Sequence, residues 1–253
     1  RSRSNNSDQN FPSSLDLISR YLSDSIKAAI ILVMKKFIPY DYFPNKSDQE
    51  MQASVDELYK LMLKRRTVRD YDSRTIPEES ILKAIQIAGL APNGANKQPW
   101  HFVLISNPEI KKEIRIAAEK EEADFYLHKP NKTWLKDLEP LGTNEEKPFL
   151  EEAPYLIAIF AENHELDEEE KKKKNYYVSE SVGIATGMLI TALHIMGLST
   201  LTHTPSPMGF MRTILKRPQN EKPYILLVVG HPKEGAMVPN ITKKSISEIC
   251  TTL

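Results

Sequence analysis

The sequence predicts a single α+β domain over residues 47–253, and three of its features indicate this class. Apolar runs at residues 101–105, 154–160 and 224–230, with a shorter one at 198–202, are typical of strands. The segments between them carry apolar residues at the three- and four-residue steps of helices. Residues 175–196 are apolar on most of the helix circumference, which predicts a helix in the middle of the fold. Strands and helices in this alternation indicate an α+β domain.

Residues 1–46 are predicted to be a flexible tail, an amphipathic helix and a linker. The tail, residues 1–14, is rich in Ser and Asn, and apolar residues then recur at helical steps from Leu15 to Ile38. This helix could dock on a partner subunit or on the protein's own core, which we favour, or lie on a membrane surface. Its longest uncharged apolar run, residues 28–34, is far short of the ~20 residues that span a bilayer.

Capping signals mark the helices inside the domain. Ser47 and Glu50 fit the capping-box pattern, and the helix that they start ends in a basic cluster at residues 64–69. Further helices are predicted from Pro77 to Gly89, from residue 106 to residue 126, and from residue 206 to residue 215. Residues 91–100 are too rich in Pro and Gly to be regular, and residues 165–174 are predicted to be a solvated loop. Residues 127–150 have no clean period, which is typical of a lid or a binding loop, and we place the lid at about residues 120–150.

Composition and missing motifs exclude several functions. Lys+Arg and Asp+Glu are both 34, so no global field attracts nucleic acid, and the single Cys250 excludes a disulfide framework and a cysteine zinc site. The six histidines lack ligand spacing, so no metal site is predicted. The glycine-rich signatures of Rossmann and P-loop proteins and the nucleophile elbow of hydrolases are absent from the sequence.

The basic cluster is the strongest remaining signal. Arg65, Arg66, Thr67 and Arg69 have the donors for a phosphate-sized anion, although its first members could equally complement the helix end that precedes them. A polar Gly/Asn loop at residues 91–98, a Thr-x-Thr-Pro turn at residue 202 and a late basic pair at residue 243 complete the set. Together these features suit a cofactor with a phosphate tail and a polar ring system.

The order of these motifs resembles the FMN-binding nitroreductase family and, within it, the iodotyrosine deiodinases. The motifs are R-R-T-V-R, A-P-N-G-A-x-x-x-P-W, the Thr-Pro strand end and L-V-V-G-H-P, and the resemblance covers roughly residues 38–253. It implies a mainly antiparallel sheet flanked by helices in a domain-swapped homodimer, with FMN at the interface. Gly183 and Gly187 would suit a dimer axis, although packing on the protein's own sheet is equally compatible.

The resemblance also implies which residues bind FMN. The expected set is Arg65, Arg66, Thr67, Arg69, Pro92, Asn93, Thr202, His203, Thr204 and Lys243. Thr202 is favoured over Thr204 as the hydroxyl that donates to flavin N5. Lys243 stands where the family has an Arg, so the charge is kept and the two-pronged donor is lost. His203 departs from a Thr-rich pattern, and we expect it to be a neutral residue that contributes its backbone.

For the substrate, the resemblance implies the backbone N–H of Ala95 for the phenolate and the lid residues Glu122, Tyr126 and Lys147 for the amino-acid zwitterion. Composition alone would favour three surface residues, but the spacing through Trp134 favours the lid. The implied reaction is reductive dehalogenation of 3-iodotyrosine and 3,5-diiodotyrosine, with Ala95 and Thr202 at the reacting groups. Electrons would come from NADPH through a partner reductase.

Three alternatives remain open from the sequence. They are a general nitroreductase of quinones and nitroaromatics, a flavin-cleaving relative, and a non-catalytic carrier of halotyrosine or flavin. The compartment is also open, because membrane association would depend on an anchor ahead of residue 1.

Overall fold

The computed structural model describes residues 37–40, 44–128, 136–166, 169 and 171–253. They divide into two compact units, residues 1–54 and 55–253, which are described separately. In the first, the capping box is confirmed, because the Ser47 backbone N–H and hydroxyl each donate to Glu50 Oε2 at 2.8 Å. It begins helix α3 (Asp48–Leu63). Most of the predicted helix at residues 15–38 lies outside the described residues, and the domain boundary at residue 47 stays a prediction.

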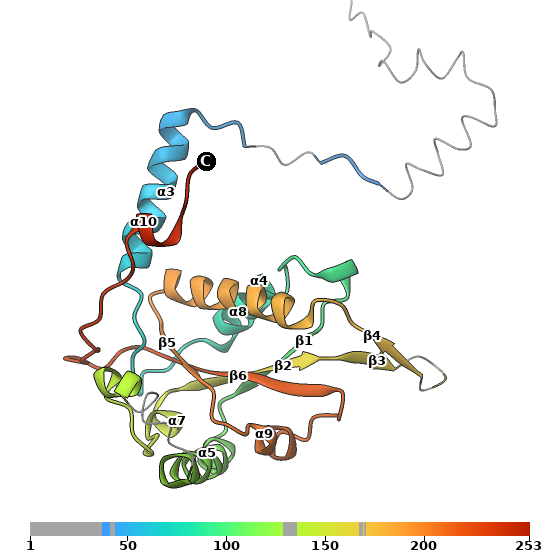
Figure 1. The fold of residues 1–253 in the computed structure, drawn as a ribbon, viewed down its shortest axis with the longest axis vertical. Coiled ribbons are helices and arrows are strands. Elements are labelled where there is room, and N and C mark those ends of the chain that lie inside the picture. Colours follow the sequence, from blue (N-terminus) through green and yellow to red (C-terminus); the bar gives the residue numbers. More distant parts are fainter. Residues whose placement is uncertain (1–36, 41–43, 129–135, 167–168, 170) are drawn as a thin grey trace, which may run out of the picture. The chain divides into compact units, whose positions relative to one another are not determined.

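A four-stranded sheet forms the centre of the second unit (Figure 1). Its order is β1 (Trp100–Ile105), β2 (Tyr155–Glu162), β6 (Glu221–Gly230) and β5 (Ser199–His203), and every neighbouring pair is antiparallel. The predicted strands and the mainly antiparallel sheet are confirmed. The central pair, β2 and β6, is almost wholly apolar because helices cover both faces.

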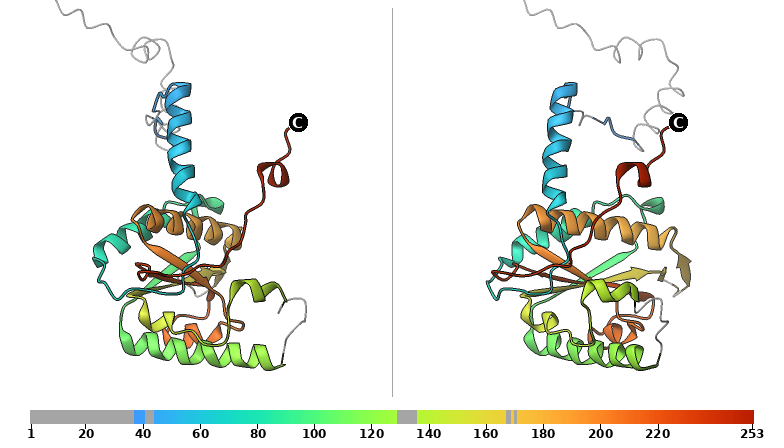
Figure 2. Two further views of the ribbon diagram at one scale, coloured as in Figure 1. Left: turned by 90° about the vertical axis from the view of Figure 1, so that its left-hand side faces the viewer. Right: turned by 60° about the vertical axis from the view of Figure 1, so that its left-hand side comes forward.

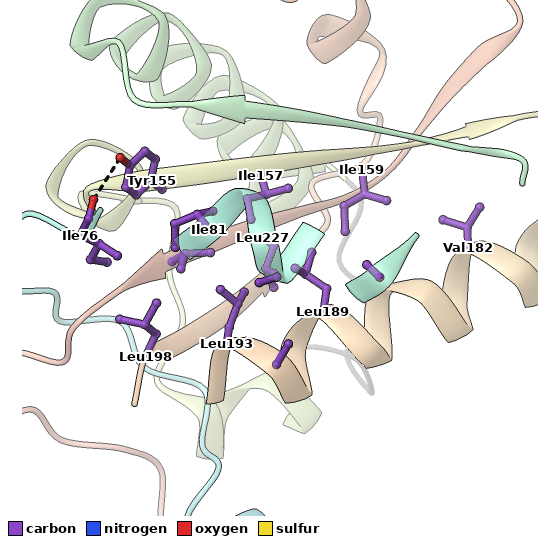
Figure 3. Close-up of a cluster of buried hydrophobic side chains, with 14 of the residues drawn as sticks. Ile76, Ile81, Tyr155, Ile157, Ile159, Val182, Leu189, Leu193, Leu198 and Leu227 are labelled. Atoms are coloured by element: carbon purple, nitrogen blue, oxygen red, sulfur yellow. Dashed lines mark hydrogen bonds between the residues drawn. The ribbon is translucent and has the colours of Figure 1, made fainter. Parts of the chain in front are cut away.

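Helices lie on both sides of the sheet (Figures 1 and 2). Alternation along the strands divides the core into two layers, one on each face. Ile157 and Ile159 of β2 face α4 (Glu78–Ala88) and α8 (Val178–Ile195), as Figure 3 shows for this cluster. Leu156 and Phe160 face the other side, where α5 (Pro108–His128), α7 (Phe149–Glu152) and α9 (Gly209–Ile214) pack. The helices therefore flank the sheet on both sides, as predicted.

Helix α8 is only partly central. Val182, Leu189 and Leu193 are buried, whereas Ile184 and Ile195 are 45% and 59% exposed. By length and composition α8 could also cross a membrane, but its buried face packs on the sheet as that of a core helix does. The two glycines differ: a Cβ on Gly183 would lie 3.2 Å from the Tyr224 hydroxyl, and one on Gly187 would meet nothing within 4 Å.

Two connecting segments are relevant here: one differs from the prediction, and the other lies beside the basic segment. The predicted loop at residues 165–174 contains a short hairpin, β3 (His164–Leu166) and β4 (Lys172–Lys174), although the β4 lysines are exposed as expected. The chain after β6 returns to the basic segment, because Lys233 N–H donates to Asp70 O at 3.0 Å and Asp72 N–H donates to His231 O at 2.9 Å. The C-terminal segment ends with α10 (Ile246–Ile249).

Candidate active site

A cavity of about 200 Å³ lies where β5 ends, between the second half of α5 and residues 138–149. Its walls combine predicted site residues from three separate parts of the chain. The predicted members are Arg69, Glu122, Tyr126, Lys147, Thr202, His203 and Thr204, and the sequence did not predict Glu121, Leu138, Leu141, Thr143, Phe149, Leu201 or Ser206. Apolar residues such as Leu138 carry no sequence signal that separates a cavity wall from a core.

Glu122, Tyr126 and Lys147 meet in this cavity. Glu122 and Tyr126 are four residues apart on α5, and Lys147 returns from the far side of the lid so that its Nζ lies 3.4 Å from Glu122 Oε2. The Lys147 ammonium also donates to Asn144 O, and the Tyr126 hydroxyl donates to Thr143 O at 3.4 Å. Trp134, through which the sequence placed the lid, lies outside the described residues.

Burial controls the charges in this group. The Lys147 and Glu122 side chains are 3% and 17% exposed. Burial lowers the pKa of Lys147, and the neighbouring Glu122 carboxylate opposes this by stabilising the ammonium. Burial also raises the pKa of Tyr126, and the Glu122 charge raises it further. A buried cation beside a partly exposed anion matches the two charges of an amino-acid zwitterion, because each charge of the ligand then has a partner largely shielded from water.

The basic segment runs alongside β5 into the same region. Val68 N–H donates to Thr200 O at 3.4 Å, and Thr67 forms a parallel bridge with Thr200. Arg69 lines the cavity, and the Arg66 guanidinium donates to Pro239 O in the C-terminal segment that also carries the exposed Lys243.

The guanidinium groups of the basic segment have no acidic partner in the described part of the chain. Among the described residues, no carboxylate pairs with Arg65, Arg66 or Arg69, although surface arginines such as Arg74 have acidic partners. Guanidinium groups suit the planar, two-pronged recognition of phosphate. These donors are therefore candidates to hold an anionic cofactor, although only Arg69 of the three lines the cavity.

His203 lines the cavity and is only 6% exposed. Alternation along β5 turns it toward α7, where its ring meets Phe149 edge to face with centroids 5.9 Å apart. No described residue forms a hydrogen bond with its Nε2. Burial, together with the nearby Lys147 and Arg69 charges, lowers the pKa of His203 to about 3. The imidazole is therefore neutral at physiological pH.

The lowered pKa of His203 predicts that the folded protein loses stability in acid. The ordinary pKa of histidine, 6.5, applies in the unfolded chain, and the pKa in the folded chain is about 3. Between these two pH values the unfolded chain binds a proton that the folded chain does not, so the free energy of unfolding falls as the pH falls through this range. At pH 4.5 the loss is about 2–3 kcal/mol. We expect His203→Thr to show a smaller drop in Tm than wild type from pH 7 to 4.5, and His164→Thr, a change in the β3 hairpin, to follow wild type. A drop in His203→Thr as large as that of wild type would contradict this assignment.

Pro92, Asn93 and Ala95 do not line the cavity of their own chain. They lie in and before the short helix η1 (Gly94–Asn96), where Ala95 has a left-handed φ of 52°. A Cβ on Gly94 would lie 3.0 Å from Tyr176 O, so this loop packs at the N-terminal end of α8. The Asn93 side chain is used within the loop, because Oδ1 accepts from Gln98 N–H at 2.8 Å.

The sheet also gathers three groups that the sequence did not connect. His101, Glu162 and Glu221, from β1, β2 and β6, have ligand-type atoms within 4.8 Å of one another. Glu221 is already held by Arg217 through hydrogen bonds of 2.7 and 2.5 Å. This ion pair accounts for the buried Glu221 charge, and the absence of a metal stays a prediction.

Comparison with known proteins identifies the class. Residues 62–231 match the family model for the nitroreductase family, and the chain belongs to that family. Within it, the chain is 50% identical over 211 residues to an iodotyrosine deiodinase of Haliscomenobacter hydrossis, which covers 82% of this chain and 93% of that protein. An iodotyrosine deiodinase of Nematostella vectensis is 42% identical over 214 residues, covering 84% and 81%.

A solved structure is consistent with these sequence relationships. The crystal structure of oxidized iodotyrosine deiodinase bound to FMN and 3-iodo-L-tyrosine has a TM-score of 0.65 and 30% identity, covering 77% of this chain and all of that one. A nitroreductase with bound FMN from Bacteroides fragilis, 22% identical with a TM-score of 0.57, shares the fold.

Proposed function

We propose that this protein is an FMN-dependent iodotyrosine deiodinase, which reductively removes iodide from 3-iodotyrosine and 3,5-diiodotyrosine and releases tyrosine. The observation that carries the proposal is the ion pair between the buried Lys147 and Glu122, which shares one cavity with Arg69 and the Thr202–Thr204 segment. The deiodinase relatives support it. A general nitroreductase of quinones or nitroaromatics has no need of a zwitterion-sized charge pair.

The cofactor residues divide by the part of FMN that they suit. Arg65, Arg66, Thr67 and Arg69 would hold the phosphate and ribityl chain, with Lys243 reaching the phosphate from the C-terminal segment. Thr202, His203 and Thr204 would lie along the ring. When bound, FMN supplies the electrons for cleavage of the carbon–iodine bond, and the protein orients the two molecules.

The substrate residues act by charge and orientation. Glu122 accepts from the substrate ammonium, Lys147 donates to its carboxylate, and Tyr126 closes the lid over the ring. Ala95 donates its backbone N–H to the phenolate. These contacts exclude water from the reacting ring, which strengthens each electrostatic contact.

The site is completed, in this proposal, by a second copy of the chain. The loop with Pro92, Asn93 and Ala95 packs away from the cavity of its own chain. Between α4 and α8 lies an apolar groove of about 640 Å³, lined by residues that include Ile87, Ile184 and Met188 and by the uncovered Gly187. A homodimer would bury this groove and bring the loop of one chain to the cavity of the other. Sedimentation equilibrium of wild type and of Ile184→Glu, a change in the groove, tests the proposed homodimer. A monomeric wild type would contradict it.

Thr202 is proposed as the hydroxyl that donates to flavin N5. Both Thr202 and Thr204 are exposed in the cavity wall, on either side of the buried His203. Removing a donor that stabilises developing charge slows chemistry about 100- to 1,000-fold. We expect Thr202→Ala to slow iodide release from dithionite-reduced protein by that factor, with FMN affinity nearly unchanged. A larger effect in Thr204→Ala would reverse the assignment.

One experiment tests the function as a whole. Purified protein loaded with FMN is titrated anaerobically with diiodotyrosine while flavin fluorescence is followed, and reduced protein is then given one equivalent of substrate. We expect strong quenching by the iodinated amino acid, weak quenching by tyrosine, and release of iodide. Bound FMN without these responses would favour the general nitroreductase, and quenching without turnover would favour a carrier.

The electron donor is proposed to be a partner reductase that uses NADPH, and nucleic acid is not expected to bind.

A further inference from the structure

Helix α5 presents one polar face to the chain that returns from the lid, residues 143–153. The side chains on this face recur at steps of three and four residues, which places them along one side of a helix. They are Lys111, Arg115, Glu119, Glu122 and Tyr126. Their partners follow in the opposite direction, from Ala153 back to Thr143, so polar contacts join the two segments along their length.

The first half of this row anchors the returning chain. Lys111 Nζ donates to the carbonyl oxygens of Glu151 and Ala153, both at 2.8 Å, and Lys111 is only 7% exposed. One turn further along, Arg115 Nη1 lies 3.3 Å from Glu151 Oε1. The C-terminal end of the returning segment is therefore fixed to α5 by donors from one helix face.

Glu119 stands between this anchor and the proposed substrate site. Its Oε1 accepts a hydrogen bond from Lys147 N–H at 2.7 Å and another from Arg115 Nε at 2.8 Å. Glu119 does not line the cavity, whereas Glu121 and Glu122 do. Its carboxylate thus acts on the backbone of Lys147, and the Lys147 side chain acts on the cavity.

We propose that Glu119 is a positioning residue for amino-acid recognition. Oriented by Arg115, it holds the Lys147 amide so that the Lys147 ammonium is already beside Glu122 before a substrate arrives. Holding a binding group in place removes the cost of ordering it on binding, which raises affinity. The inference rests on the proposed function, in which Lys147 binds the substrate carboxylate.

The test compares substrates with and without the amino-acid group. With FMN-loaded protein, we expect Glu119→Ala to raise KM for iodotyrosine about tenfold with kcat nearly unchanged, because one charge-assisted hydrogen bond is lost. KM for 2-iodophenol, which lacks the zwitterion, should not change. Glu119→Gln keeps an acceptor for the Lys147 amide and should restore most of the affinity. Glu113→Ala, an exposed change on the same helix, is the matched control.

A second readout needs neither cofactor nor substrate. Hydrogen exchange at the Lys147 amide should be faster in Glu119→Ala than in wild type, and protected in Glu119→Gln and Glu113→Ala. Equal KM increases for iodotyrosine and 2-iodophenol, or unchanged exchange at Lys147, would overturn the proposal. A wild type that fails to prefer iodotyrosine over 2-iodophenol would sink the proposed function instead, and the exchange rates would then decide alone whether Glu119 holds Lys147.

Discussion

Lys147→Met is expected to lower kcat/KM for iodotyrosine by about 100-fold or more, while reduction of a quinone by the same protein changes little. Lys147 is the buried donor of the cavity, and its removal leaves Glu122 without the cation that lies 3.4 Å from it. Breaking a buried pair costs about 3–5 kcal/mol because one charge stays uncompensated. Part of this cost will lower the stability of the folded protein, and the rest will weaken substrate binding.

The measurement is steady-state kinetics with two substrates on one preparation. Methionine keeps the length and burial of the lysine stem, so the change is mainly one of charge. Lys136→Met, an exposed change in the described part of the lid segment, is the control and should leave both activities intact. Parallel loss of iodotyrosine and quinone activity would mean that Lys147 supports the fold or the cofactor, and would remove it from substrate recognition.

Arg69→Gln is expected to weaken FMN binding by about 10- to 100-fold. Arg69 lines the cavity, and no acidic partner among the described residues uses its donors. A charge-assisted hydrogen bond contributes about 1.5–3 kcal/mol, which corresponds to this range. Arg69→Lys should recover only part of the loss, because the ammonium keeps the charge without the planar fork.

Titration of cofactor-free protein with FMN, followed by flavin fluorescence, gives the Kd for each variant. Arg74→Gln provides the control, since Arg74 is 62% exposed and paired with Asp72 at 3.4 Å. The weakening should be smaller at high salt, where the wild-type contact is screened. An Arg69→Gln protein with wild-type affinity would place the phosphate away from this residue.

Local pattern determined the secondary structure of this chain. The apolar runs, the capping box at Ser47 and the apolar face of α8 each reflect hydrogen bonding and burial within a few residues, so their sequence signals are direct. The same is true of Glu122 and Tyr126, whose four-residue spacing places both on one helix face. The nitroreductase resemblance followed from the order of short sequence motifs, and the antiparallel sheet was implied by that resemblance.

Tertiary structure alone decided how distant segments meet. The burial of Lys147 against Glu122, the contact of Arg66 with Pro239 O, and the gathering of His101 with two glutamates depend on strand register and on packing across the sheet. The role of Glu119 rests on a bond to a backbone N–H, which every residue except proline carries and which leaves no mark in the sequence. By itself, the sequence determined the helices and strands, the basic cluster, and the placement of Glu122 and Tyr126 on one helix face. The fold decided which of them share a cavity and which, like Ala95, lie outside it, because contacts between segments far apart in the sequence are set by global packing and not by local propensity.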